Sequence, residues 1–273
     1  MIRLVCDKEQ NLKQFTDNVC PQASFYFSRL LKDKEIKVNG KKVSTDLRLN
    51  KGDIIEYYLT KKQAEKPAYY PVYEDENILV IDKESGVNSE AVFADLTRKS
   101  GGRYAFIHRL DRNTSGVMAF AKNEKTERAL LLAFKEKRVE KIYIARCFGE
   151  FTAKEKVLKA YLKKDENNSL VQIYDTPVKH SEEIITEYKN AQKQADGTWL
   201  VEIKLHTGKT HQIRAHLAHI NCAIVGDMKY GDTQKNKERN NARQCLVAKR
   251  LTFYLDGELA YLQDKTFTSR FEV

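Results

Sequence analysis

Apolar residues recur at alternating or helical spacing along most of the chain, and this pattern predicts both strands and helices. Strands are expected at NILVIDK (77–83), GVMAFAK (116–122), KIYIARCFG (141–149), IITEYKNA (184–191) and TWLVEIKLHT (198–207). The strands and helices alternate without a regular β–α–β rhythm, and few long crossovers separate neighbouring strands. The pattern therefore predicts an α+β fold with a largely antiparallel sheet and flanking helices.

Two helices are predicted in the second half of the chain. NEKTERALLLAFKEK (123–137) has Asn123 as its expected cap and basic residues in its last turn. KTHQIRAHLAHI (209–220) places Ile213, Leu217 and Ile220 on one face, which predicts a stripe that packs against the core.

The first sixty residues have their own pattern. Leu12, Phe15 and Val19 recur at helical spacing until Pro21 stops the helix, and Ser24 is expected to cap a second helix. IKVNGKKV (36–43) and LNKGDIIEYYL (49–59) then predict a hairpin around an Asn-Gly turn and a closing strand. We expect three segments: a small domain at 1–60, a linker at 61–73 that carries two of the four prolines, and a large domain at 74–273.

Charge narrows the possible partners. The chain of 273 residues carries a formal net charge of +10, and residues 1–62 hold 13 basic against 8 acidic residues. This excess favours a polyanionic partner such as RNA. The five cysteines form no CxxC pair, no apolar run is long enough to span a membrane, and the N-terminus has no signal-peptide pattern. We therefore expect a cytoplasmic protein.

Two other functions are disfavoured by spacing. TGKT (207–210) ends like a phosphate-binding loop, but Ile203 stands where that loop requires its first glycine. His211, His216 and His219 have neither cysteines nor paired carboxylates nearby, so no metal site is expected, and no organic cofactor is indicated.

HRLDRNTSGV (108–117) is the candidate for chemistry. It places Asp111 between Arg109 and Arg112, and a turn sequence follows. Neighbouring guanidinium groups favour the anionic carboxylate, which could act as a nucleophile or base. On a strand, Arg109 and Asp111 would share a face and Arg112 would point away. Arg–Asp pairs are common on surfaces, so these residues alone leave a simple ion pair open.

Three segments in order resemble the RluA-type pseudouridine synthases. HRLDRNTSG fits the family's HRLDRxTSG motif, EKIYIARCFG resembles its KxYxAxxxG strand, and LHTGKTHQIRAHL…GDMKYG resembles its LxTGRTHQIRxHL…GDxxYG block. The similarity covers roughly residues 74–273 and implies the fold of that catalytic domain. It also implies that a specific uridine in ribosomal or transfer RNA is flipped out and isomerised to pseudouridine.

The resemblance also implies roles for individual residues. Asp111 would be the indispensable catalytic residue, Tyr143 would pack against the base and handle the C5 proton, and Arg214 would pair with Asp111 and keep it ionised. Arg109 would fill the space that the flipped base leaves. Arg112, Lys209 and His211 are further expected RNA-binding residues.

The first sixty residues resemble the alpha-L RNA-binding domain of the ribosomal-protein-S-four type. The resemblance rests on Ser28-Arg29, on the VNG turn, and on Lys51-Gly52-Asp53 before the last strand. Arg29, Lys32, Lys37 and Lys41 are therefore expected to contact the RNA backbone.

The sequence departs from the family pattern at three places. Lys209 replaces the usual arginine, Leu246-Val247-Ala248 replaces LHA, and Lys83-Glu84-Ser85-Gly86 replaces KPxG. These changes affect the expected choice of substrate rather than the reaction. Two alternatives remain open, a non-catalytic RNA-binding or assembly protein and an RNA N-hydrolase that releases uracil. We expect a monomer that does not associate with membranes.

Overall fold

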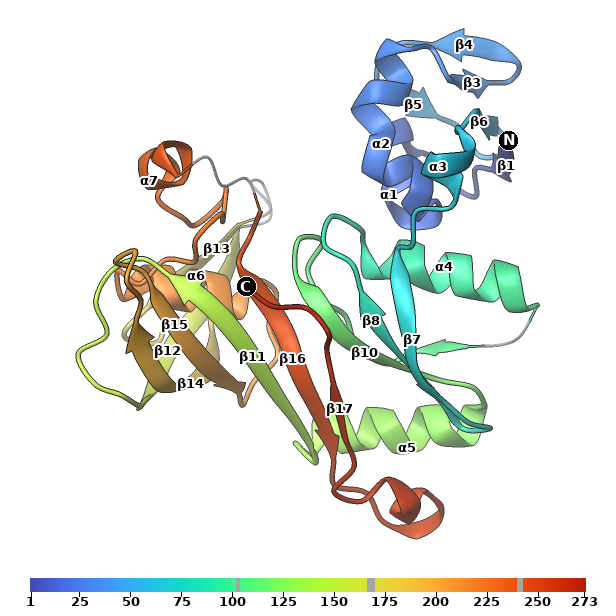
Figure 1. The fold of residues 1–273 in the computed structure, drawn as a ribbon. Helices are drawn as coiled ribbons and strands as arrows, with labels where there is room; N and C mark the ends of the chain where they lie inside the picture. The colour runs from blue at the N-terminus through green and yellow to red at the C-terminus, as the bar shows by residue number, and fades with distance from the viewer. Residues whose placement is uncertain (102–103, 166–169, 240–242) are drawn as a thin grey trace.

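The structure is a computed structural model that describes residues 1–101, 104–165, 170–239 and 243–273. A large sheet of 11 strands and a smaller one of four organise these residues, beside a separate two-stranded sheet (Figure 1). The large sheet is mixed but mostly antiparallel and has helices on both faces, which confirms the predicted α+β class. No helix in the described ranges has both the length and the apolar character needed to cross a bilayer.

The N-terminal unit (residues 1–60) is built from a short sheet and two helices. The sheet has the order β1-β6-β3-β4, and Phe15, Leu30 and Ile55 are buried between it and the helices. Its elements are β1 (Ile2–Val5), β2 (Gln10–Asn11), α1 (Leu12–Val19), α2 (Pro21–Lys32), β3 (Ile36–Val38), β4 (Lys41–Val43), β5 (Arg48–Leu49) and β6 (Ile54–Tyr57). Positive φ angles of 50° at Asn39 and 78° at Gly40 confirm the predicted hairpin turn.

Two predictions about this part of the chain are wrong. Ser24 does not cap a helix, because α2 already begins at Pro21, whose fixed φ angle suits the first helical position. The buried Ser24 hydroxyl instead donates to Asp17 at 2.6 Å. Nor is 61–73 only a linker, since it contains the short helix α3 (Lys61–Ala64) and most of strand β7 (Tyr69–Glu74). Pro71 is tolerated there because β7 is the edge strand of the large sheet.

The C-terminal unit (residues 69–273) contains an 11-stranded sheet whose main path runs β13-β12-β14-β15-β11-β16-β10-β8-β7. Strands β9 and β17 pair with β10 and β16 beside this path. The strands after β7 are β8 (Ile78–Lys83), β9 (Ala105–Phe106), β10 (Ser115–Ala121), β11 (Val139–Cys147), β12 (Lys156–Asp165), β13 (Leu170–Tyr174), β14 (Glu182–Lys193), β15 (Trp199–Leu205), β16 (Leu246–Phe253) and β17 (Thr266–Thr268).

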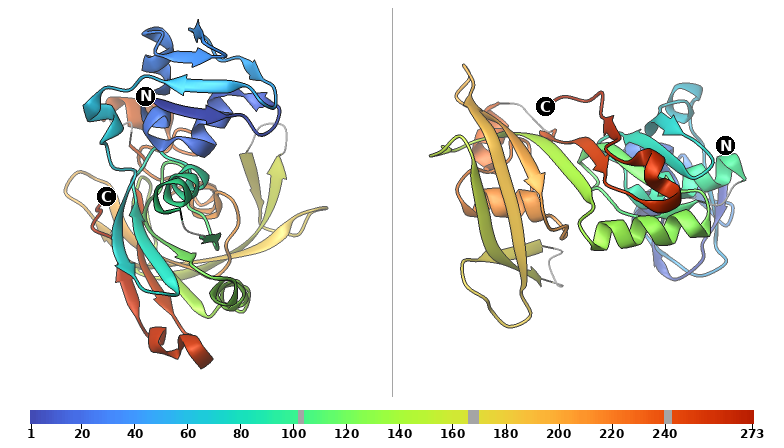
Figure 2. Two further views of the ribbon diagram at one scale, coloured as in Figure 1. Left: turned by 90° about the vertical axis from the view of Figure 1, so that its right-hand side faces the viewer. Right: turned by 90° about the horizontal axis from the view of Figure 1, so that it is seen from below.

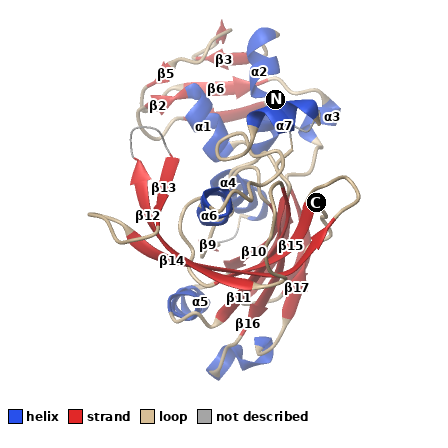
Figure 3. Cartoon of the chain, turned by 90° about the vertical axis from the view of Figure 1, so that its left-hand side faces the viewer, coloured by secondary structure: helices blue, strands red, loops and turns tan. Residues whose placement is uncertain are grey.

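Helices cover both faces of this sheet. They are α4 (Ser89–Ser100), α5 (Glu124–Lys135), α6 (Gln212–His219), α7 (Thr233–Glu238) and the 3₁₀ helix η1 (Gly257–Leu262). Helices α4 and α6 lie on one side of the curved sheet and α5 lies on the other (Figure 3). Leu79 and Ile81 of β8 therefore pack with the first pair of helices, while Ile78 and Val80 pack with α5. This two-sided burial explains the continuous apolar runs of the central strands.

The predicted cap of α5 and the predicted core stripe of α6 are confirmed. The Asn123 side chain accepts a hydrogen bond from the Thr126 amide at 2.9 Å, which fixes the start of α5. In α6, Ile213 and Leu217 are buried in the main core, and Ile220 packs against it.

The two halves of the large sheet meet where β10 runs parallel to β16. The register there pairs Gly116 with Ala248. Gly116 has a φ of +124°, and a Cβ on it would lie 2.3 Å from the Ala248 carbonyl oxygen. Only glycine allows this close approach, so the glycine of the HRLDRNTSG motif, which lies in β10 and not in the expected turn, is required at the sheet junction.

We predict that Gly116→Ala lowers the free energy of unfolding by about 3 kcal/mol, because the new methyl group strains the backbone and also collides with β16. Gly197→Ala is the matched control, since Gly197 also has a positive φ, of +79°, but nothing lies within 4 Å of its Cβ position. Gly197→Ala should lower the free energy of unfolding by about 1 kcal/mol. Urea unfolding of both variants measures the difference, and equal losses would show that the close approach to β16 is unimportant.

Candidate active site

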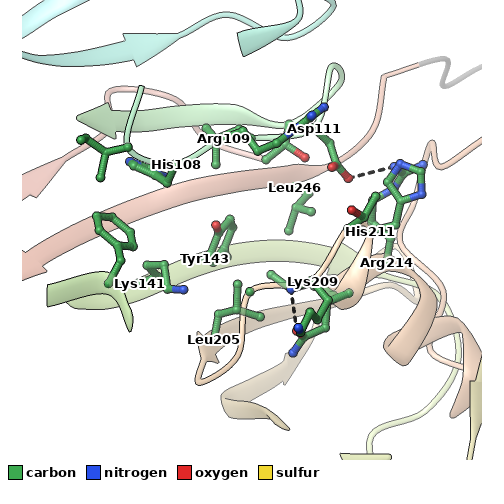
Figure 4. A pocket seen from close by; sticks show the side chains of 18 of the residues that line it. His108, Arg109, Asp111, Lys141, Tyr143, Leu205, Lys209, His211, Arg214 and Leu246 are labelled. Atoms are coloured by element: carbon green, nitrogen blue, oxygen red, sulfur yellow. Dashed lines mark hydrogen bonds and ion pairs between the residues drawn. The ribbon is translucent and has the colours of Figure 1, made fainter. Parts of the chain in front are cut away.

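A cavity of about 440 Å³ opens between the HRLDR loop, strand β11 and the start of α6 (Figure 4). Asp111, Tyr143 and Arg214 all line it, although they are far apart in the sequence. The tertiary structure thus brings together the three residues for which the family resemblance implied catalytic roles.

The HRLDR loop is positioned by hydrogen bonds to its backbone. The Ser89 hydroxyl at the start of α4 accepts from the Leu110 amide at 3.1 Å and donates to the Leu110 carbonyl at 2.9 Å. The Arg112 carbonyl accepts from the Gly86 amide at 2.8 Å and from Lys83 Nζ at 3.2 Å. Asp111 lies between these two anchored residues, so its backbone is held on both sides.

Lys83 is a supporting residue for which the sequence analysis predicted no role. Its side chain is fully buried, and its amine donates to the carbonyl groups of Glu84, Val87 and Arg112. Burial lowers the pKa of Lys83 to about 7, although the Asp111 carboxylate acts in the opposite direction. Three carbonyl acceptors match the three N–H donors of the ammonium group, which explains why a lysine is buried here.

Arg214 joins two carboxylates. Its Nη1 donates to Asp111 Oδ2 at 2.9 Å, while Nε and Nη2 donate to the two oxygens of Asp227 at 2.7 and 2.9 Å. The Arg214 side chain is 7% exposed and that of Asp227 only 1%, whereas that of Asp111 is 21% exposed. The bidentate pair with Asp227 therefore fixes the guanidinium, and the third bond presents it to Asp111 from inside the protein.

The pKa shifts in this network follow from its geometry. Burial alone would raise the pKa of Asp227, but the hydrogen bonds and charge of Arg214 outweigh it and lower that pKa. Burial would likewise lower the pKa of Arg214, yet Asp227 and then Asp111 raise it. Both groups are therefore charged, and Asp111 faces a permanent cation.

Tyr143 contributes a neutral phenol to the cavity. It lies on β11, and its ring is packed in the main core. Burial raises its pKa well above the usual value for tyrosine, and the negative charge of Asp111 raises it further. Within the described residues, no protein group forms a hydrogen bond with the Tyr143 hydroxyl, so this group is available to a molecule in the cavity.

His108 also lines the cavity and is held in its neutral form. Its Nε2 accepts a hydrogen bond from the Ala119 amide at 3.1 Å, and its ring stacks on Phe134 with centroids 4.8 Å apart. Burial, assisted by the charge of Lys141, lowers the pKa of His108 to about 3. The first residue of HRLDR therefore fixes the loop to β10 and does not exchange protons near neutral pH.

The predicted RNA-binding residues divide into three groups. Arg109, Lys209 and His211 line the cavity; Arg109 is paired with Glu90 at 2.7 Å, Lys209 is paired with Glu182, and His211 Nδ1 lies 2.9 Å from the Tyr230 hydroxyl. Arg29, Lys32, Lys37 and Lys41 belong to the N-terminal unit. Arg112 points away from the cavity, as predicted, although residues 108–114 do not form a strand.

Several residues that support or line the cavity had no predicted role, among them Asp227, Lys83 and Lys141. Asp227 stands in the GDMKYG segment and Lys83 in KESG, so their positions in quoted segments were the only signal. Lys141 precedes Tyr143 by two residues on the same face of β11 and also faces the cavity. In the described part of the chain, no group of three or more His, Cys, Asp or Glu side chains could hold a metal ion.

Comparison with known proteins agrees with the fold. Residues 63–219 match the model of the family described as RNA pseudouridylate synthase. The chain therefore belongs to the RNA pseudouridine synthases, and its sequence motifs and relatives place it in the RluA-type branch. It is an isomerase that converts uridine to pseudouridine in RNA.

Among its relatives are ribosomal large subunit pseudouridine synthases C. The protein from Rickettsia bellii is 32% identical over 231 residues, covering 75% of this chain and 76% of the relative. The protein from Vibrio cholerae is 32% identical over 228 residues, covering 75% and 71%. The solved structure of human RNA pseudouridylate synthase domain containing 1 has the same fold, with a TM-score of 0.61, 23% identity, and coverage of 75% of this chain and 90% of that one.

We predict that His108 makes the fold sensitive to acid. Its folded pKa of about 3 lies below the unfolded value of about 6.5, so the unfolded state binds more protons between these values and stability falls as the pH falls. Between pH 6.5 and pH 5.5, the free energy of unfolding of the wild type should fall by up to about 1 kcal/mol more than that of His108→Gln. Urea unfolding at both pH values measures this, and equal losses would contradict it.

We predict that Asp227→Asn lowers kcat/KM by about 100-fold, because a buried guanidinium that loses its bidentate partner no longer holds Asp111 in place. Circular dichroism would verify that the variant is folded at the assay temperature. Asp175→Asn is the control, because the side chain of Asp175 is 85% exposed. Full activity of Asp227→Asn would show that Asp111 alone positions Arg214.

Proposed function

We propose that this enzyme modifies uridines in the RNA of the large ribosomal subunit, with Asp111 as the catalytic residue. The observation that carries the assignment of Asp111 is its position in the cavity, 2.9 Å from a buried and permanently charged Arg214. The substrate class is supported by the relatives from Rickettsia bellii and Vibrio cholerae, which are named for the large ribosomal subunit.

The reaction needs a carboxylate that reaches the target nucleoside. The N1–C1′ bond breaks, the base turns, and a C5–C1′ bond forms; C5 then loses its proton and N1 gains one, so the product is an isomer. Asp111 would assist the first step as nucleophile or base. Its partial exposure lets it meet the substrate, whereas Asp227, which is 1% exposed, is too deeply buried to do so.

The target base would enter the cavity by leaving its stack in the RNA, since its reacting atoms are shielded inside a helix. Tyr143 would pack against the base. Because burial raises the pKa of Tyr143, its hydroxyl is protonated and would relay the C5 proton rather than act as a phenolate base. Arg109, exposed beside the cavity, would occupy the space that the base vacates.

We also infer that residues 1–60 form an alpha-L RNA-binding domain. The hairpin β3–β4 presents Lys37 and Lys41, and Arg29 and Lys32 lie in the last turn of α2. Arg29, Lys32 and Lys41 are exposed and Lys37 is half-exposed. Such cations suit contact with phosphate groups rather than with particular bases. The domain would therefore add affinity, while the cavity selects the base.

The enzyme would act as a monomer in the cytoplasm. One chain supplies Asp111, Tyr143 and Arg214 to a single cavity, so the site needs no second subunit. None of the five cysteines, all of which lie in the described ranges, forms a disulfide, which is typical of a reducing compartment.

The test is tritium release from RNA labelled with [5-³H]uridine, using unmodified large-subunit ribosomal RNA and unmodified transfer RNA as separate substrates. We expect release from the ribosomal RNA by the wild type, and a rate at least about 1,000-fold lower for Asp111→Asn. Asp256→Asn, whose side chain is 90% exposed in the wild type, should behave like the wild type.

Three results would contradict parts of this proposal. Free uracil among the products would indicate hydrolysis instead of isomerisation. Release from transfer RNA alone would overturn the ribosomal assignment. Equal rates for the wild type and Asp111→Asn would overturn the role of Asp111.

A further inference from the structure

The N-terminal unit contacts the HRLDR loop directly. Helix α1 packs beside α4, and Figure 2 shows the N-terminal unit at the end of the large sheet where α4 lies. Two hydrogen bonds join the units there: Asn88 Nδ2 donates to Asn18 Oδ1 at 3.3 Å, and Arg98 Nη1 donates to the Val19 carbonyl at 3.2 Å.

The strongest link between the units is made by Arg112, the residue that follows Asp111. Its Nη1 forms an ion pair with Asp17 of α1, and its Nη2 donates to the Ser24 hydroxyl of α2 at 3.2 Å. Ser24 in turn donates to Asp17 at 2.6 Å, which closes a ring of three side chains. The Asp17 side chain is 14% exposed and that of Arg112 33%, so this bridge is better shielded from water than an ordinary surface ion pair.

Arg112 is thus held at both ends by different parts of the protein. Its carbonyl is anchored by Lys83 and Gly86 of the C-terminal unit, and its guanidinium is anchored by the N-terminal unit. Asp111 shares a peptide unit with Arg112, and its side chain has one hydrogen bond from the protein within the described residues, the bond from Arg214. A shift of the Arg112 backbone would therefore be passed to the Asp111 carboxylate through this peptide unit.

We propose that Asp17 is a positioning residue of the active site, which acts through Arg112 to set the orientation of Asp111. The N-terminal unit then has a second role besides RNA binding, because its docked position is part of the catalytic geometry. Arg112, which the sequence analysis assigned to RNA, serves this bridge. The inference rests on the proposed role of Asp111.

Kinetics separate positioning from RNA binding. Asp17→Asn keeps the shape of the side chain but removes its charge, and we expect kcat to fall about tenfold with KM changed less than about twofold, because displacement of a reacting group mainly affects the chemical step. Asp33→Asn, at the opposite end of α2 from Ser24, removes an exposed charge of the same unit and should leave kcat unchanged.

A double-mutant cycle tests whether Asp17 acts through Arg112. The double variant Asp17→Asn/Arg112→Gln should be no slower than Arg112→Gln alone, since both substitutions break the same bridge. The proposal would be overturned if the loss of rate in the double variant equalled the product of the losses in the two single variants. A rise in KM at constant kcat for Asp17→Asn, which would assign Asp17 to RNA binding, would also overturn it.

Hydrogen exchange gives a readout that does not depend on activity. In Asp17→Asn, the amides of Gly86, Leu110 and Thr114, which are hydrogen-bonded in and around the loop, should exchange faster than in the wild type. Ser24→Ala weakens the same bridge from α2 and should have a smaller effect in the same direction. Unchanged exchange in both variants would overturn the proposal even if the RNA substrate proved to be a different one.

Discussion

The buried guanidinium of Arg214 is the constraint on which the active site depends. A charged group removed from water is tolerated when its donors are matched by acceptors, and a partner of opposite charge offsets more of the desolvation cost. Asp227 satisfies two of the N–H groups, and its Oδ1 also accepts from the amides of Lys229 and Tyr230 at 2.8 and 3.1 Å. The remaining bond, to Asp111, is consequently directed into the cavity by a rigid support.

The site lies at the junction between the two halves of the large sheet, and the order of the strands there explains this position. Asp111 precedes β10, Tyr143 lies on β11, and both strands are neighbours of β16. The parallel pairing of β10 with β16 requires the close approach at Gly116, which fixes where the HRLDR loop ends. Packing on both faces of these strands makes the junction stiff, so a carboxylate from one half of the sheet can meet an arginine that belongs to the other half.

Local sequence signals were reliable where the structure is decided locally. The Asn123 cap, the Asn39-Gly40 turn and the apolar stripe of α6 each depend on residues a few positions apart, and all three are present. Ser24 was misassigned because two residue types that start helices lie close together, and Pro21 begins α2 first. The edge strand β7 was missed because a proline there resembles a linker until its pairing with β8 is known.

The sequence by itself determined the family and the fold class, and it singled out Asp111, Tyr143 and Arg214, because each lies in a short motif whose order is visible along the chain. The tertiary structure alone decided how these residues are held. Asp227 and Lys83 lie in motif segments and Asp17 lies in none, but no local pattern shows what any of the three does. Each of them contacts a residue distant from it in the sequence. Their contributions depend on burial and on partners brought together by folding, and neither of these is encoded in the spacing of residues along the chain.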